Sequence, residues 1–242
     1  MAPRTILATM RGAPTDARHV SPIVRLDLND QVYDAIKARL LTREFGGGAK
    51  ISLQTLADEL GVSRSPVHHA LTRLRTEGLV LSEPRGYVVR PLTAELMDEL
   101  HEARLALELH AALLTIGSLS AAQLERFHEL LEETIAPVRD RRMTDVGRYL
   151  LANAAFHEYQ VDLAGNATIS EMYRRLCVFP LQQRALVVLS ESAAGDSDEE
   201  HRSIVDAYER SDLDAARAAL AANVETGRRI ARAVIERAGG TL

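Results

Sequence analysis

Apolar residues recur at helical spacing along much of the chain, and breaks that contain Gly or Pro divide this pattern into segments. In the first regular segment, Val32, Ile36 and Leu40 lie four residues apart. This spacing places the three side chains on one face. It therefore predicts an amphipathic helix over about 30–43, ended by the glycine run at 46–48.

Two short helices separated by a turn are predicted next. The first covers about 52–60, and Gly61 can adopt the positive φ that ends it. Ser63 or Ser65 can cap the second helix, and Pro66 suits its first turn because a missing N–H costs nothing there. Helical spacing gives the second helix an apolar stripe that packs on the first: Val67, Ala70, Leu71 and Leu74 against Leu56 and Leu60.

The opposite face of the second helix is polar and carries Arg64, Ser65, His68 and Thr72. In a DNA-reading helix-turn-helix, the leading end of the second helix enters the major groove. Short or basic side chains there reach phosphates and base edges. Taken alone, the same residues also suit an ordinary helical hairpin with a solvated face.

Two β-prone runs follow, over residues 79–82 and 87–90. The Glu-Pro-Arg-Gly sequence between them favours a turn, so they predict a β-hairpin with Arg85 at its tip. A hairpin in this position is the wing of a winged helix-turn-helix, and a basic tip suits contact with phosphate or the minor groove. The predicted wing therefore favours a DNA-binding module over an ordinary helical hairpin with a solvated face.

Beyond Pro91, Gly and Pro become sparse and Ala, Leu, Glu and Arg dominate. This composition predicts helices joined by short loops into an antiparallel bundle. The predicted helices cover about 94–116, 121–139, 144–163, 167–189, 198–210 and 213–237. The expected fold class is therefore mainly α: an N-terminal winged helix-turn-helix with a small β-hairpin wing, followed by an all-α antiparallel bundle.

The net charge of −5 hides an asymmetry along the chain. Residues 1–92 carry 13 Lys and Arg against 9 Asp and Glu, whereas the remainder carries 16 against 25. The basic part is the part expected to face phosphates. No apolar run approaches the roughly 18 residues of a membrane span. The single Cys177 excludes an internal disulfide and suits a reducing compartment, so we expect a cytoplasmic protein.

The segments LADELGVSRSPVHHALTRLRTEGLV and SEPRGYVV resemble the DNA-binding module of the GntR family of bacterial transcription regulators. The resemblance implies DNA contacts from the second helix and the wing, to which the outward-facing Thr72 is added. These candidates are Ser63, Arg64, Ser65, His68, Thr72, Arg85 and Gly86. His68 and His69 replace the usual Arg-Glu of the family, and Gln54 replaces a frequent basic residue, so the operator is expected to differ.

The second half resembles the all-helical FCD effector domain of the FadR-like branch of the same family. The similar pieces are HEARLALELHAALL, NAAFHEYQVDLAGN and EEHRSIVDAYERSDLDAARAALAANV. Together with the lack of a continuous apolar segment at the start, the two resemblances predict three parts. These are a flexible tail over 1–25, a winged helix-turn-helix over 26–92, and a helical effector-binding and dimerisation domain over 93–242.

Four positions of the second half imply a pocket. In FCD proteins the residues matching Asn153, His157, His201 and Asn223 are typically Asp, His, His and His, which converge on a divalent metal such as zinc or nickel. Amide oxygens are poor ligands for these metals, and two of the four positions are Asn here. The alternative is a cavity of two imidazoles and two amides that binds a polar organic ligand directly.

Arg104 lies four residues before Glu108 on the first bundle helix, and the simplest interpretation is a weak pair within that helix. In FCD relatives the matching Arg often points into the cavity, where a guanidinium can hold a carboxylate. Arg184 is a second candidate for this role. The resemblance therefore implies an effector site with an acidic metabolite as ligand, formed by Arg104, Asn153, His157, Arg184, His201 and Asn223.

The sequence thus predicts a ligand-responsive transcription regulator, a repressor released by a small carboxylate metabolite. It is expected to act as a homodimer on a palindromic operator, because two linked modules add their contacts on one site. One alternative is an effector-independent DNA-binding protein whose bundle only dimerises. The other is a helical-bundle metal enzyme. The chain lacks paired Glu-x-x-His motifs, a glycine-rich nucleotide loop and a nucleophile elbow, so no enzymatic activity is expected.

Overall fold

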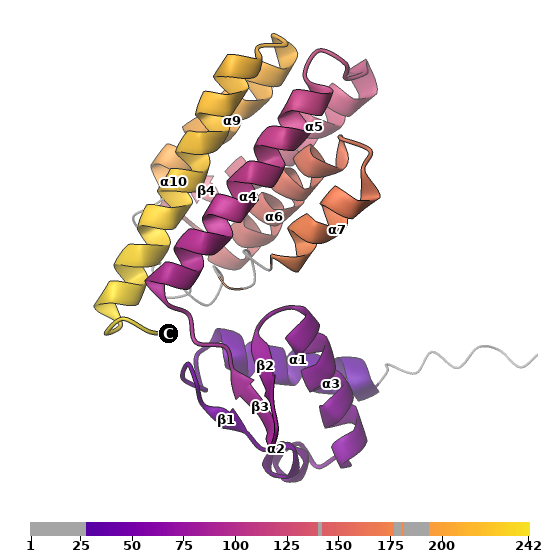
Figure 1. The fold of residues 1–242 in the computed structure, drawn as a ribbon, viewed down its shortest axis with the longest axis vertical. Helices are drawn as coiled ribbons and strands as arrows, with labels where there is room; N and C mark the ends of the chain where they lie inside the picture. Colours follow the sequence, from indigo (N-terminus) through magenta and orange to yellow (C-terminus); the bar gives the residue numbers. More distant parts are fainter. Residues whose placement is uncertain (1–27, 140–141, 177–180, 182–193) are drawn as a thin grey trace, which may run out of the picture.

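The computed structural model of the protein describes residues 28–139, 142–176, 181 and 194–242. Figure 1 shows a small body that combines helices with a β-sheet, and a larger helical body stacked on it along the long axis. The predicted fold class, mainly α with a small β-hairpin wing, is confirmed. Among the described residues, none of the helices is long and apolar enough to cross a membrane.

The small body consists of three helices beside a three-stranded antiparallel sheet. Its elements are α1 (Leu28–Leu41), β1 (Lys50–Ile51), α2 (Leu53–Leu60), α3 (Arg64–Thr76), β2 (Val80–Glu83) and β3 (Gly86–Val89). The strand order is β1-β3-β2, so the predicted hairpin forms two of the three strands. The sequence pattern missed β1, because two residues are too few to show an alternation of apolar and polar side chains.

Gly61 ends α2 as predicted, whereas the predicted side-chain cap of α3 does not form. The side chain of Ser52 caps α2 by accepting from the N–H of Thr55 at 3.2 Å, and Gly61 ends the helix at φ 66°. The prediction that Ser63 or Ser65 caps the second helix is wrong, because Ser63 makes no side-chain capping bond and Ser65 lies inside α3. The predicted stripe is buried against Leu56 and the half-buried Leu60: Val67, Ala70, Leu71 and Leu74.

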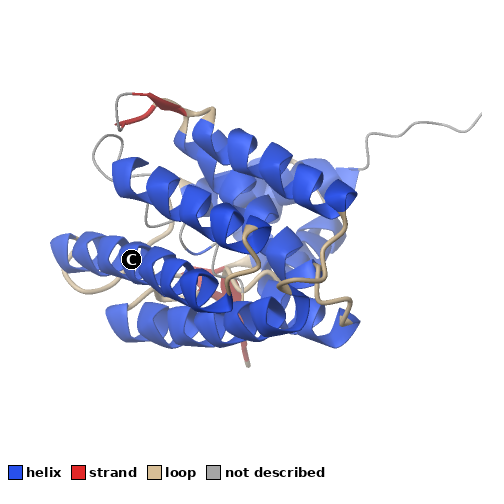
Figure 2. Ribbon diagram, turned by 90° about the horizontal axis from the view of Figure 1, so that it is seen from above, coloured by secondary structure: helices blue, strands red, loops and turns tan. Residues whose placement is uncertain are grey.

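The larger body is a bundle whose helices lie side by side in the view from above (Figure 2). The described helices are α4 (Ala94–Thr115), α5 (Ala121–Ile135), α6 (Val146–Asp162), α7 (Ala167–Arg175), α9 (Ala194–Glu209) and α10 (Leu213–Arg237). α10 packs on α4 and α9, and α5 packs on α6 and α9. Phe127 and Phe156 are both fully buried and meet in the core, with 4.8 Å between ring centroids.

Three predicted helices of the bundle differ from the observed ones. The helix expected over 198–210 begins already at Ala194, as α9. The helix expected over 121–139 ends at Ile135, because Pro137 cannot continue it. A small antiparallel ladder of β4 (Val138–Arg139) and β5 (Arg142–Met143) follows instead. The helix expected over 167–189 is present as α7 up to Arg175. Much of its remainder lies outside the described residues, as do Cys177, Arg184 and the predicted tail over 1–25.

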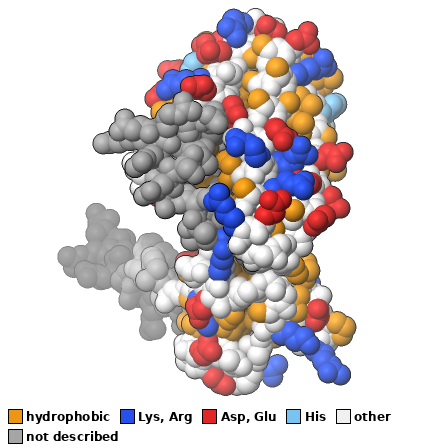
Figure 3. All heavy atoms as spheres, turned by 90° about the vertical axis from the view of Figure 1, so that its left-hand side faces the viewer, with side chains coloured by type: hydrophobic (Ala, Val, Ile, Leu, Met, Phe, Trp, Pro, Cys, Tyr) orange, Lys and Arg blue, Asp and Glu red, His pale blue; other side chains and the backbone are white. Residues whose placement is uncertain are grey.

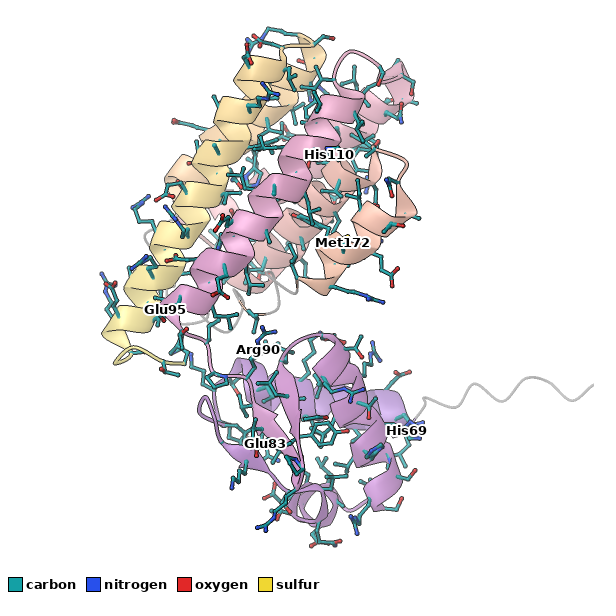
Figure 4. The ribbon with its side chains drawn as sticks, viewed as in Figure 1. His69, Glu83, Arg90, Glu95, His110 and Met172 are labelled. Atoms are coloured by element: carbon teal, nitrogen blue, oxygen red, sulfur yellow. The ribbon has the colours of Figure 1, made fainter. Side chains whose placement is uncertain are left out.

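The two bodies meet at a junction that involves both backbone and apolar side chains. The N–H of Leu92 donates to the carbonyl oxygen of Leu242 at 2.8 Å, and the N–H of Leu242 donates back at 3.0 Å. Val234 and Ile235, near the end of α10, belong to the same hydrophobic core as the small body. Figure 4 shows Arg90 between the two bodies. α10 is thus tied to the small body.

Gly47 lies against this junction, so its replacement by alanine tests the contact. A Cβ at Gly47 would lie 2.2 Å from the carbonyl oxygen of Leu242, which is too close for any real contact. Because the obstructing atom is backbone, Leu242 must shift from its pairing with Leu92. We expect Gly47→Ala to lower the free energy of unfolding by about 1–3 kcal/mol, measured by chemical denaturation. Gly46→Ala is the matched control because its Cβ meets nothing within 4 Å. An equal loss of unfolding free energy in both variants would show that the junction between Gly47 and Leu242 does not contribute to stability.

Candidate nucleic-acid interface and effector site

The predicted DNA-contact residues lie at the leading end of α3 and at the hairpin turn. Ser63, Arg64, Ser65 and His68 are exposed, and so is Arg85 in the turn between β2 and β3. In Figure 1, α2 and the hairpin turn occupy the end of the small body that points away from the bundle. These side chains are therefore exposed on the elements that lie at the end of the small body remote from the bundle.

Three cations line one groove at this end. Arg64 and Arg85 border a surface groove of about 340 Å³ together with Lys50 of β1. Within the described part of the chain, none of the three forms an ion pair with an acidic side chain. Sequence reasoning missed Lys50, because only the position of β1 beside β3 brings it to the wing. Cations without an ion-pair partner on one groove can neutralise the phosphate groups of a nucleic-acid backbone.

The face of α3 that follows Arg64 contacts the wing strand. The ring of His68 lies edge-on to that of Tyr87, with 6.2 Å between centroids, and the hydroxyl of Thr72 is 3.2 Å from the Tyr87 hydroxyl. Thr72 is half-buried, so it connects helix and wing, whereas His68 remains exposed. Gly86 adopts φ 131°, a backbone conformation that favours glycine, directly after the turn.

Several arginines on the bundle form ion pairs, in contrast to the three cations of the groove. Figure 3 shows one face on which blue and red side chains are interspersed over the helical body. Arg232 of α10 binds Asp98 at 2.6 Å, and Arg228 pairs with Glu225. Among the described residues, Arg228 and Arg232 are therefore neutralised by carboxylates, whereas the three cations of the groove are not.

The second candidate site is a cluster of buried polar side chains inside the bundle, which we term the effector cluster. Its members come from α4, α6, α7, α9 and α10: Arg104, Glu108, Asn153, His157, Gln160, Tyr173, His201 and Asn223. Among the described residues, the predicted site residues Arg104, Asn153, His157, His201 and Asn223 all belong to it. Arg184 lies outside the described residues.

His157 and His201 face each other through their Nε2 atoms, which lie 3.2 Å apart. The Nε2 of His201 is also 2.9 Å from the Oδ1 of Asn153. Because an amide oxygen only accepts, this contact assigns the Nε2 hydrogen to His201 and leaves His157 Nε2 as an acceptor. Burial, with the nearby charges of Arg104 and His201, holds the pKa of His157 well below its ordinary value, so its ring is neutral.

Arg104 is the cation of the effector cluster, and Glu108 already neutralises it. The Nε of Arg104 donates to Glu108 Oε1 at 2.7 Å, and its Nη2 donates to Asn223 Oδ1 at 3.0 Å. The hydroxyl of Tyr173 donates to the same Glu108 oxygen at 2.6 Å. Burial opposes the charge of the guanidinium, but Glu108 and Tyr173 outweigh it and raise the pKa of Arg104.

Glu108, Gln160 and Tyr173 are site residues that sequence reasoning missed. The spacing of Arg104 and Glu108 indicated a pair, and the pair exists, but the structure buries it completely. Gln160 lies one turn beyond His157 and two turns beyond Asn153 on α6, a spacing that could have placed it in the same cluster. No sequence signal identified Tyr173, because only the packing of α7 on α4 and α6 brings it to Glu108.

The chemistry of these side chains does not fit a resident zinc or nickel ion. His157 Nε2, His201 Nε2 and Asn153 Oδ1 converge, but the oxygen of Asn223 accepts from a guanidinium cation. Two imidazoles with one amide oxygen, beside a positive charge, provide neither the carboxylate nor the thiolate that completes such sites. Within the described residues, the chain likewise has no group of three His, Cys, Asp or Glu arranged to hold a metal.

Comparisons with known proteins agree with both parts of the molecule. The chain matches the family model "Bacterial regulatory proteins, gntR family" over residues 28–89 and the model "FCD domain" over residues 99–226. It is 28% identical over 188 residues to "Uncharacterized HTH-type transcriptional regulator YdhC" of Bacillus subtilis, covering 77% of this chain and 83% of that one.

A second relative is named "Probable D-xylose utilization operon transcriptional repressor" and comes from Paenarthrobacter nicotinovorans. It is 29% identical over 205 residues, which are 84% of this chain and 88% of the relative. Among solved structures, "E. coli McbR/YncC" is similar with a TM-score of 0.66 and 23% identity, over 88% of this chain and 99% of that one. This structural likeness supports the fold.

The matched families and relatives are transcription regulators and not enzymes, so the expectation that the chain is not an enzyme is confirmed. The FCD model alone covers more than half of the chain, and the gntR model covers the winged part that precedes it. The chain is a DNA-binding transcription regulator, and it belongs to the gntR family as a member with an FCD domain.

Proposed function

We propose that this regulator binds a palindromic operator as a homodimer and represses transcription until a small metabolite in the effector cluster releases it. The observation that carries the DNA-binding role is the groove in which Lys50, Arg64 and Arg85 have no ion-pair partner within the described residues. Since a regulator of this kind acts on the chromosome, we place it in the cytoplasm.

Dimerisation is proposed through the bundle. Leu113 and Leu114 of α4 and Met172 of α7 are about half-exposed, which is unusual for large apolar side chains. Figure 4 shows His110 on α4, one turn before the two leucines, and Met172 on the neighbouring α7. A second copy that covers these residues would bury them and fix two winged modules on one operator.

α10 supports a coupling between effector and operator. Asn223 in the middle of this helix binds Arg104, whereas Val234 and Ile235 near its end pack into the core shared with the small body. A ligand that rearranges the contact of Arg104 with Asn223 would act on a helix attached to the DNA-binding part. A coupling of about 1–3 kcal/mol would change operator affinity by roughly 5- to 150-fold.

The effector first proposed from Arg104 is a small carboxylate. Such a ligand would have to replace Glu108, whose carboxylate already binds the Nε of Arg104 at 2.7 Å. The alternative is an effector-independent protein whose bundle only dimerises. In such a protein the buried polar cluster would have no function. The charged and polar residues inside the bundle favour the ligand-responsive function, because burying them costs stability that an apolar core would not lose.

Replacing Arg64 with alanine tests the DNA-binding role. The change removes an exposed cation at the first residue of α3, so we expect operator affinity to fall by about 1–3 kcal/mol, which is roughly 5- to 150-fold. The measurement is a gel-shift titration on a genomic fragment selected by the wild-type chain. Arg217→Ala on α10 is the matched control, because this exposed arginine lies on the bundle. Wild-type affinity of the Arg64 variant would show that α3 is not the recognition helix.

A further inference from the structure

Two acceptor atoms of the effector cluster have no hydrogen-bond partner among the described residues, namely Glu108 Oε2 and Gln160 Oε1. Both side chains are fully buried. They belong to one neighbourhood, because Gln160 Nε2 donates to the backbone oxygen of Glu108 at 3.0 Å and to the hydroxyl of Tyr208 at 2.7 Å. These contacts also fix the amide orientation, since the backbone oxygen can only accept.

The donors around Glu108 are already committed to its other oxygen. Arg104 Nε and the Tyr173 hydroxyl both donate to Oε1, and His157 Nδ1 lies 3.3 Å from the same atom. Buried acceptors are nearly always satisfied in folded proteins, because leaving one unpaired costs much of its desolvation energy. The cluster therefore calls for a group that donates hydrogen bonds to Oε2 and to the Gln160 oxygen.

The charge balance of the cluster defines the class of this donor. Glu108 compensates the charge of Arg104 within the same ion pair, and His157 is neutral. A second carboxylate would place two negative charges around one guanidinium, and an ammonium would leave an excess positive charge. A hydroxyl group donates a hydrogen bond and adds no net charge in a buried site.

We propose that the effector is an uncharged polyhydroxylated molecule of the sugar or polyol class, whose hydroxyl groups donate to Glu108 Oε2 and Gln160 Oε1. The inference rests on the proposed function, because it names the ligand class of the same cluster. It also assigns Glu108 as the acceptor that selects the ligand.

The experiment measures binding of defined probes to the full chain by calorimetry and by thermal unfolding. The probes are D-xylose and xylitol as hydroxylated compounds, glutarate as an acid without hydroxyls, and putrescine as an amine. We expect at least one hydroxylated probe to bind, and neither glutarate nor putrescine to do so. Excluded polyols also raise melting temperatures without binding, and this general effect is equal in all variants.

Glu108→Gln separates specific binding from the general effect. Glutamine keeps an oxygen that can accept from Arg104 and Tyr173 but lacks the second carboxylate oxygen, so we expect about tenfold weaker binding of the hydroxylated probe. Gln160→Met removes the other acceptor and is expected to weaken binding by a similar factor. Glu102→Gln, the same chemical change on the exposed side of α4, is the matched control. Circular dichroism verifies that each variant is folded.

Three results would overturn the inference. Binding of glutarate that strengthens in the Glu108 variant would identify an acid effector on Arg104, and binding of putrescine alone would identify a cation. Equal responses of wild type and both variants to every hydroxylated probe would show that water alone satisfies the two acceptors. Each of these results leaves the gel-shift test of Arg64 unaffected, so failure of the ligand class is distinguishable from failure of the DNA-binding function.

Discussion

Replacing Glu108 with leucine is expected to lower the free energy of unfolding by about 3–5 kcal/mol. Arg104 is 1% exposed, and Glu108 is the carboxylate that neutralises it, at 2.7 Å. Without this partner the fold must keep a buried positive charge, and Tyr173 loses the acceptor of its hydroxyl. Equilibrium denaturation in urea, followed by circular dichroism, measures the loss.

The double variant Arg104→Met with Glu108→Leu separates charge from packing. It removes both charges and leaves apolar side chains of similar length, so we expect it to be more stable than Glu108→Leu alone. A higher free energy of unfolding in the double variant would show that the destabilisation of Glu108→Leu comes from the unpaired guanidinium of Arg104. If the double variant were less stable than the single one, the buried ion pair would not be the cause, and the shape of the two side chains would decide.

The winged part could be predicted almost completely, because its signals are local. Gly61 ends α2, the apolar stripe of α3 has regular spacing, and the Pro-Arg turn fixes the hairpin. The exposure of Arg64 follows from the same spacing, and the exposure of Arg85 follows from its place in the turn. What the sequence could not reveal is β1, whose two residues become a strand only by pairing with β3, and with it the position of Lys50.

The bundle was predicted less evenly, because its boundaries and its cluster depend on contacts over long distances in sequence. The extent of α5 was overestimated, since the residues after Pro137 have helix-forming composition but pair as β4 and β5. The spacing of Asn153 and His157 is a local signal. Their contact with His201 on α9 depends on the packing of α6 near α9 within the bundle core.

The role of Glu108 shows why burial, and not spacing, decides the chemistry of this cluster. On a solvated helix the pair with Arg104 would contribute only a few tenths of a kcal/mol. Enclosure by α6, α7 and α10 removes water from the same pair, so each partner becomes necessary for the other. Whether a helix face is enclosed depends on every other helix, and the spacing of two residues does not contain this information.

Lowering the pH from 7 to 4.5 is expected to remove most of about 3 kcal/mol that His101 contributes to stability. His101 is fully buried, its Nδ1 donates to the carbonyl oxygen of Met97 at 2.7 Å, and burial with the charge of Arg104 lowers its pKa from 6.5 to about 4. The unfolded chain therefore takes up a proton near pH 6.5, whereas the folded chain does so only near pH 4. The stability that depends on neutral His101 is fully present above about pH 6.5, and it is lost as the pH falls toward 4.

The variant His101→Gln isolates this contribution from other titrations. Asp198 acts with the opposite sign, because burial raises its pKa to about 6 and so favours the folded state as the pH falls. Asp198 is present in both chains, so its effect cancels in the comparison. Urea denaturation at several pH values should show the wild-type chain losing about 2–3 kcal/mol more than the variant between pH 7 and pH 4.5. Parallel profiles of the two proteins would show that His101 is protonated as easily in the folded chain as in the unfolded one, and that its burial does not lower its pKa.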